Sequence, residues 1–143
     1  MLKKIVLGLF FGCVAMVSYA DETINLKYAE AFEKSKNEGK PLVVLISAKW
    51  CPHCVTMKSE TVEPMKKDGS LKDAIVTIVD VDDEPELVKS LYIINEKTKE
   101  KITSIPQIMV FTPPQQQEPK KYGLVGRQGQ TRVLELLKKV LNK

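Results

Sequence analysis

Trp50-Cys51-Pro52-His53-Cys54 places two thiols three positions apart, directly after the apolar run from Leu42 to Ile46. That run is five residues long and rich in β-branched side chains, which predicts a strand buried on both faces of a sheet. A helix continuing over residues 55–62 would put Cys51 at its N-terminus, where unpaired N–H groups and the helix dipole stabilise a thiolate. Cys54 then lies one turn further along, close enough to form a disulfide with Cys51.

Helical and strand patterns alternate along the rest of the chain. Helices are predicted over residues 27–38, 55–63, 85–92 and 133–141, and strands over residues 42–46, 74–81, 107–111 and 122–125. Pro64 is expected to end the second helix, because proline cannot donate to the helical ladder. A parallel strand–helix–strand unit followed by a hairpin and a closing helix predicts an α/β fold, with a central mixed sheet of about four strands and helices on both faces. The stretches 95–101 and 112–121 are predicted to be exposed.

The first twenty residues have the layout of a secretory signal peptide. Lys3 and Lys4 precede the apolar stretch Ile5 to Val17, and small residues end the segment at Ala20. The apolar part is shorter than the roughly 20 residues of a membrane span, which favours cleavage after Ala20 over an uncleaved anchor. We therefore expect a signal peptide over residues 1–20, a single domain over residues 21–143, and a periplasmic location.

Cys13 offers a second interpretation of this segment, because a cysteine preceded by glycine can be the lipidated residue of a bacterial lipoprotein. Phe10-Phe11-Gly12 is a poor version of that signal, and cleavage there would leave an apolar run on the mature protein. Ordinary cleavage is therefore favoured over lipoprotein anchoring at Cys13.

Composition narrows the function of the remaining chain. The 143 residues are 43% hydrophobic and 28% charged, as in an ordinary globular domain. Removing Lys3 and Lys4 takes the 22 basic residues to 20, against 18 acidic ones, and this near balance argues against a nucleic-acid binder. Cleavage also removes Cys13, so Cys51 and Cys54 are the only cysteines left in the mature chain. So short a loop stabilises a fold little, and chemistry explains the pair better than structure does.

The element order, the Trp-Cys-x-x-Cys at a strand-to-helix junction and Ile105-Pro106 directly before a strand resemble the thioredoxin superfamily over residues 23–141. The resemblance implies a thioredoxin-like fold and a thiol:disulfide oxidoreductase. It also implies a cis peptide bond at Pro106, facing the cysteines, and an Ile105 backbone that binds an extended client segment. Cys51 is expected to be the exposed thiol that forms a mixed disulfide with the client, and Cys54 to resolve it.

The central dipeptide Pro52-His53 is that of the periplasmic disulfide oxidase DsbA. A histidine beside the thiolate favours the reduced pair, so His53 is a candidate catalytic residue that makes the disulfide more oxidising. Ile105 before the proline is instead typical of thioredoxin. The mature chain also has no room for the large helical insertion that DsbA carries. The direction of electron flow stays open. Trp50 and Pro52 are expected to flank the bound client, with Trp50 shielding the disulfide.

Two positions depart from the superfamily pattern. Leu45 stands six residues before Cys51, where related proteins often have a buried acid that assists proton transfer from the second cysteine. The proton of Cys54 is then expected to leave through water or another group. The extra polar stretch 93–101 before the Ile105-Pro106 pair is expected to influence which client docks.

The expected partners follow from the predicted chemistry. They are client proteins with thiols or disulfides and a membrane-bound redox partner, with no nucleic acid, and the protein is expected to be a monomer. No cofactor is expected beyond the redox-active disulfide Cys51–Cys54. A rival hypothesis is a copper-binding module, because Cu(I) accepts two thiolates. Structural zinc normally needs four ligands, and His53 is the only histidine in the chain.

Overall fold

The computed structural model describes residues 26–113 and 120–142. The predicted signal peptide, Cys13 and most of the predicted loop over residues 112–121 lie outside these ranges. Within them, no helix is both long enough and apolar enough to cross a membrane.

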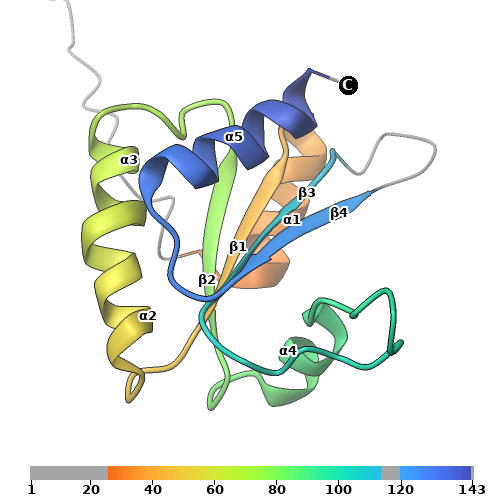
Figure 1. Ribbon diagram of the computed structural model, residues 1–143. Coiled ribbons are helices and arrows are strands. Elements are labelled where there is room, and N and C mark those ends of the chain that lie inside the picture. Colours follow the sequence, from red (N-terminus) through yellow and green to blue (C-terminus); the bar gives the residue numbers. More distant parts are fainter. Residues whose placement is uncertain (1–25, 114–119, 143) are drawn as a thin grey trace, which may run out of the picture.

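A four-stranded sheet in the order β2-β1-β3-β4 forms the centre of the fold (Figure 1). The strands are β1 (Leu42–Ser47), β2 (Ile75–Asp80), β3 (Gln107–Phe111) and β4 (Lys121–Val125). β1 pairs parallel with β2 and antiparallel with β3, and β3 pairs antiparallel with β4. All six residues of β1 are buried, as its apolar run predicts. The predicted mixed sheet of four strands is therefore confirmed.

Helices cover both faces of the sheet (Figure 1). On one face lie α1 (Tyr28–Glu38) and α4 (Pro85–Leu91); on the other lie a long helix, α2 (Pro52–Met57), η1 (Lys58–Val62) and α3 (Glu63–Lys67), and the closing helix α5 (Gln130–Leu141). Alternate residues of β1 pack into two separate core clusters, with Val43 and Leu45 on the α2 and α5 side and Val44 and Ile46 on the α1 and α4 side. The alternation of side chains along a strand produces this division.

The prediction that the second helix ends before Pro64 is wrong. The helix continues to Lys67 through a π-helical segment, in which the Glu63 N–H donates to the carbonyl of Lys58, five residues back. In an α-helix the carbonyl of Glu60 would need the N–H that Pro64 lacks. The side chain of Gln130 supplies that donor instead, with Nε2 3.1 Å from the Glu60 oxygen. A tertiary contact thus satisfies the carbonyl that the proline leaves unpaired.

The polar stretch before β3 is an exposed loop closed on itself. Asn95 N–H donates to the carbonyl of Glu100 at 2.8 Å, and Ile94 pairs with Lys101 in an isolated antiparallel bridge. The loop starts at Ile93, whose side chain lies over β4 at Gly123: a Cβ on that glycine would be 2.5 Å from Ile93 Cδ1. Only glycine at position 123 leaves room for Ile93 in this place.

Candidate active site

The cysteine pair lies where β1 ends and α2 begins. Cys51 has an extended backbone and is the N-cap of α2, Pro52 occupies the first turn, and Cys54 follows as the third helical residue. Cys51 and Cys54 form a disulfide, with their Cα atoms 5.2 Å apart. The predicted position of Cys51 at a helix N-terminus is confirmed.

The two cysteines differ in burial. Cys54 is 0% exposed and Cys51 is 6% exposed. Both are buried because they pack with Ala48 and are flanked by Val81 and Ile105. Cys51 is thus the more accessible of the two cysteines. It is nevertheless buried, whereas the sequence predicted an exposed thiol. The backbone N–H of Cys54 donates to Cys51 Sγ at 3.2 Å. A thiolate at this sulfur would accept the same hydrogen bond at the positive end of the helix, which stabilises the anion.

The segment before β3 forms a wall of the site. The Ile105–Pro106 peptide bond is cis, the isomer that the resemblance implies, and the Ile105 side chain packs against the cysteine cluster. The carbonyl of Pro106 accepts from Gly126 N–H at 2.8 Å. Among the described residues the N–H of Ile105 has no hydrogen-bond partner. A polar main-chain group is therefore available beside the disulfide.

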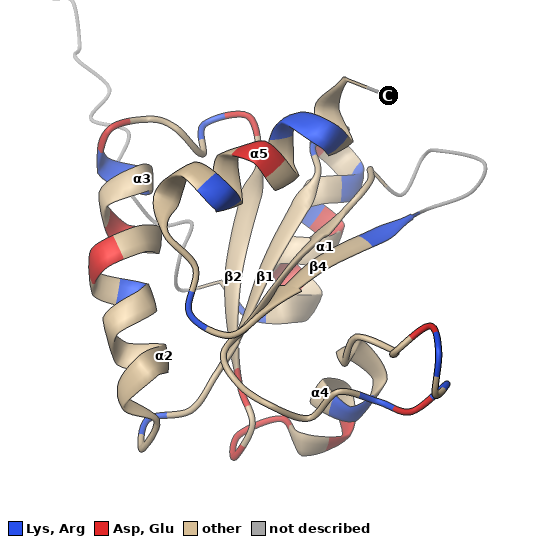
Figure 2. Ribbon diagram, viewed as in Figure 1, with Lys and Arg blue, Asp and Glu red and all other residues tan. Residues whose placement is uncertain are grey.

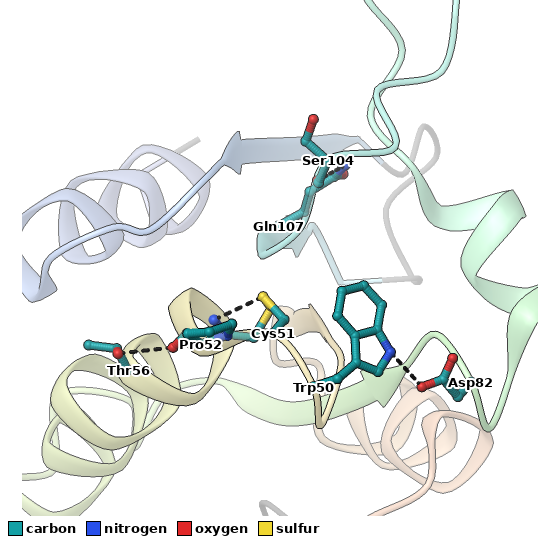
Figure 3. The surroundings of a disulfide bond; sticks show 8 residues. Trp50, Cys51, Pro52, Thr56, Asp82, Ser104 and Gln107 are labelled. Carbon is teal, nitrogen blue, oxygen red and sulfur yellow. Dashed lines mark hydrogen bonds between the residues drawn. A yellow bond between two sulfur atoms is a disulfide. The ribbon is translucent and has the colours of Figure 1, made fainter.

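Trp50 forms an exposed rim of the site and is tied to the turn after β2. The residue is 67% exposed, and its indole Nε1 donates to Asp82 Oδ2 at 2.8 Å (Figure 3). Next to it, Lys49 Nζ lies 3.1 Å from Asp83 Oδ2, and the hydrogen bond and charge of Asp83 raise the pKa of Lys49. Figure 2 shows the acidic turn that precedes α4. Two polar contacts thus join the turn that carries Trp50 to the turn after β2.

Replacing Asp82 by alanine should free the indole of Trp50. Because Trp50 is the only tryptophan in the chain, the protein has a single indole N–H resonance to follow by NMR. We expect this resonance to shift upfield and its hydrogen exchange to accelerate, since the charged acceptor of the N–H is lost. Asp83→Ala is the matched control: it removes the ion pair of Lys49 and should leave the indole resonance nearly unchanged. Equal effects of the two variants would contradict the assignment of Asp82 as the partner.

Pro52 and His53 are exposed in the first turn of α2. In the part of the chain that the structure describes, the side chain of His53 forms no hydrogen bond or ion pair. Its role in tuning the thiolate stays a prediction. The described residues also contain no group of three or more His, Cys, Asp and Glu side chains arranged to hold a metal ion.

Leu45 is 0% exposed, and its neighbours in register are Ile78 on β2 and Ile108 on β3. Its surroundings in the sheet are therefore apolar, and no acid replaces the missing carboxyl on the paired positions.

Two residues near the site were not predicted from the sequence. Asp82 lies between the strand predicted over residues 74–81 and the helix predicted over residues 85–92, and Gln107 is the first residue of the strand predicted over residues 107–111. Gln107 is fully buried and donates to the carbonyl of Ser104 (Figure 3). A polar residue at the start of an otherwise apolar strand, directly after proline, is the one sequence signal that could have indicated it.

Residues 23–113 match the protein family described as thioredoxin-like. The fold is similar to that of chloroplastic thioredoxin z, with a TM-score of 0.61 and 17% identity over 82% of this chain and 93% of that one. It is also similar to the germline-specific thioredoxin Deadhead of Drosophila melanogaster, with a TM-score of 0.59 and 21% identity over 82% of this chain and 95% of that one. A thioredoxin from Thermus thermophilus has a TM-score of 0.58 and 19% identity over 80% of this chain and 83% of that one. The search of curated protein sequences gave no significant match.

Proposed function

Because this chain belongs to the thioredoxin-like family, we propose that it is a thiol:disulfide oxidoreductase that exchanges disulfides with client proteins through Cys51 and Cys54. The observation that carries the proposal is the disulfide at the N-terminus of α2, whose first sulfur already accepts a backbone N–H. The difference in burial favours Cys51 as the sulfur that meets the client and Cys54 as the resolving thiol.

In the reductive direction, the Cys51 thiolate attacks one sulfur of a client disulfide. A bond forms between Cys51 and that sulfur, the client S–S bond breaks, and the second client sulfur leaves as a thiolate. Cys54 then gives up its proton to water or another base and attacks the Cys51 sulfur. The client leaves with both of its sulfurs reduced, and two electrons have passed from the cysteine pair to the client. The oxidative direction runs through the same steps in reverse.

The client is proposed to bind as an extended segment along Ile105. Main-chain hydrogen bonds of this kind add a strand without demanding a particular client sequence. The N–H of Ile105, which has no partner within residues 26–113 and 120–142, and the packing of its side chain against the cysteine cluster support this placement. Trp50, Pro52 and His53, all exposed, would border the bound segment.

We further propose that the protein is exported to the periplasm and exchanges electrons with a membrane-bound redox partner. The signal-peptide pattern over residues 1–20 supports export. An oxidising compartment suits a protein whose remaining cysteines form a disulfide. The periplasmic setting would require a partner that carries electrons to or from the membrane.

Cys54→Ala should trap covalent adducts with client proteins. With the resolving thiol gone, Cys51 attacks a client disulfide and the mixed disulfide has no internal nucleophile to break it. We expect reductant-sensitive bands above the mass of the free chain on non-reducing gels, after incubation with periplasmic proteins under mildly oxidising conditions.

The double variant Cys51→Ala/Cys54→Ala is the control for this experiment and should form no adducts. If Cys54→Ala forms none either, and the unmodified protein fails to reduce insulin, the proposed activity is wrong. The direction of electron flow would follow from equilibration with glutathione: a potential near about −270 mV indicates a reductase, and one near about −120 mV an oxidase.

A further inference from the structure

Gln107 carries a fully buried amide at the start of β3, the strand that follows the cis proline. Its neighbours in register are Ile46 on β1 and Val125 on β4, and its side chain shares a face of the sheet with Met109. A buried amide destabilises a protein unless its hydrogen-bonding groups are paired. The partners of this amide therefore indicate what the residue does.

All three partners belong to the backbone of residues 93–104. Ile93 N–H donates to Gln107 Oε1 at 3.2 Å, and Gln107 Nε2 donates to the carbonyls of Ile102 and of Ser104, the latter at 2.9 Å. Both N–H groups of the side chain are used, and the oxygen accepts one bond. The opposite orientation of the amide would set its NH₂ against an N–H and its oxygen against two carbonyls, so the network permits one orientation only.

The amide closes the base of the loop between α4 and β3. Ile102 N–H donates to the carbonyl of Ile93 at 2.7 Å, so these two residues already pair across the base. Gln107 bonds the other polar group of each, accepting from the N–H of Ile93 and donating to the carbonyl of Ile102, so its amide bridges the same two residues a second time. The side chain of Ile93 holds the same end of the loop against β4 at Gly123.

The hydrogen bond from Gln107 to the carbonyl of Ser104 orients the N–H of Ile105, the group proposed to bind the client. The carbonyl of Ser104 and the N–H of Ile105 belong to one trans peptide unit, in which they point in opposite directions. Because the carbonyl of Ser104 is held by a buried amide, the N–H of Ile105 is directed away from that amide, and it has no partner among the described residues. Figure 3 shows Ser104 and Gln107 on the segment across from Cys51.

We propose that Gln107 is a positioning residue for client binding: its amide orients the Ser104–Ile105 peptide unit and holds the 93–104 loop, so that the backbone of Ile105 is presented to an extended client segment beside the disulfide. The inference rests on the proposed function, since it takes Ile105 to be the docking point. It separates client docking, which depends on Gln107, from sulfur chemistry, which depends on Cys51 and Cys54.

The test compares two disulfide substrates with the Gln107→Met variant, which keeps the length of the side chain and removes the amide. Pre-reduced protein is mixed with excess insulin, a protein disulfide, or with oxidised glutathione, which is too small to add a strand. We expect the apparent dissociation constant for insulin to rise roughly tenfold, as for the loss of one to two hydrogen bonds. The limiting rate with insulin and the rate with oxidised glutathione should stay within about twofold of those of the unmodified protein, and the reduction potential should not change.

Two further variants keep the result interpretable. Ser35→Ala removes the hydrogen bond that another fully buried residue donates, to the carbonyl of Lys40 at the opposite end of β1, and should leave insulin binding unchanged. Gln107→Asn stays polar but is one methylene too short to reach all three partners, so it should repeat the binding defect even if Gln107→Met does not fold.

Unchanged insulin binding in a folded Gln107 variant would overturn the inference, as would an equal loss of rate with insulin and with oxidised glutathione. Neither result touches the proposed function. A failure of that function would be seen separately, as an unmodified protein that reacts with neither disulfide.

Discussion

The Cys51→Ser variant should lose disulfide exchange almost completely, with insulin reduction falling on the order of 10³-fold or more, to the rate of the added small thiol alone. A serine hydroxyl is not ionised near neutral pH and does not attack a disulfide. Cys54 cannot replace Cys51, because its side chain is 0% exposed behind Ala48, Val81 and Ile105. The measurement is the turnover of insulin disulfides with dithiothreitol as the electron source.

Cys54→Ala is the matched control, because it also removes the disulfide but keeps the accessible sulfur. Pre-reduced and then freed of dithiothreitol, it should perform the first step once per chain and stop as a mixed disulfide, whereas Cys51→Ser should perform neither step. Thermal unfolding of both variants shows whether lost activity reflects lost structure. The roles of the two cysteines would have to be exchanged if Cys51→Ser kept a tenth of the activity or more while Cys54→Ala formed no adduct.

Leu45→Asp should reduce the free energy of unfolding by about 4 kcal/mol at neutral pH, because a carboxylate would replace an apolar side chain at a fully buried position. The neighbours of Leu45 across the sheet, Ile78 and Ile108, have no group that could pair with the charge. The superfamily pattern often has an acid at this position, so the variant tests whether this sheet can hold one.

The loss should depend on pH in a defined direction. Burial raises the pKa of the introduced carboxyl above its ordinary value of about 3.9 in the unfolded chain. Below about pH 4 both states hold a neutral acid and the variant is at its most stable relative to the unmodified protein. That stability is lost as the pH rises from about 4 through the raised pKa, because only the unfolded state ionises freely.

Urea unfolding at pH 4 and pH 7 measures this difference, with Leu45→Asn as the control. Asparagine has nearly the same shape as aspartate and no charge, so its destabilisation should be similar at the two pH values. A destabilisation by Leu45→Asp that does not change with pH would show that the carboxylate reaches water or a cation, and that the site around position 45 is not apolar.

The fold was predictable because its main elements have strong local patterns. The apolar run Leu42 to Ile46 marks a strand buried on both faces, and all of β1 is buried. The end of the second helix was not predictable, because the partner that satisfies the Glu60 carbonyl is Gln130, seventy residues away. Local rules for proline describe the hydrogen bond that is lost, and they do not describe a distant side chain that replaces it.

The sequence by itself determined the chemistry of this protein: two cysteines three positions apart after a buried strand place a thiol at a helix N-terminus, since strand, turn and helix are all local structures. Only the tertiary structure decided what surrounds that thiol. Trp50 meets Asp82, and the amide of Gln107 meets Ile93, Ile102 and Ser104. Trp50 and Asp82 are 32 positions apart, and Gln107 and Ile93 are 14 apart. A buried polar group finds such a partner only when the sheet and its loops have packed together.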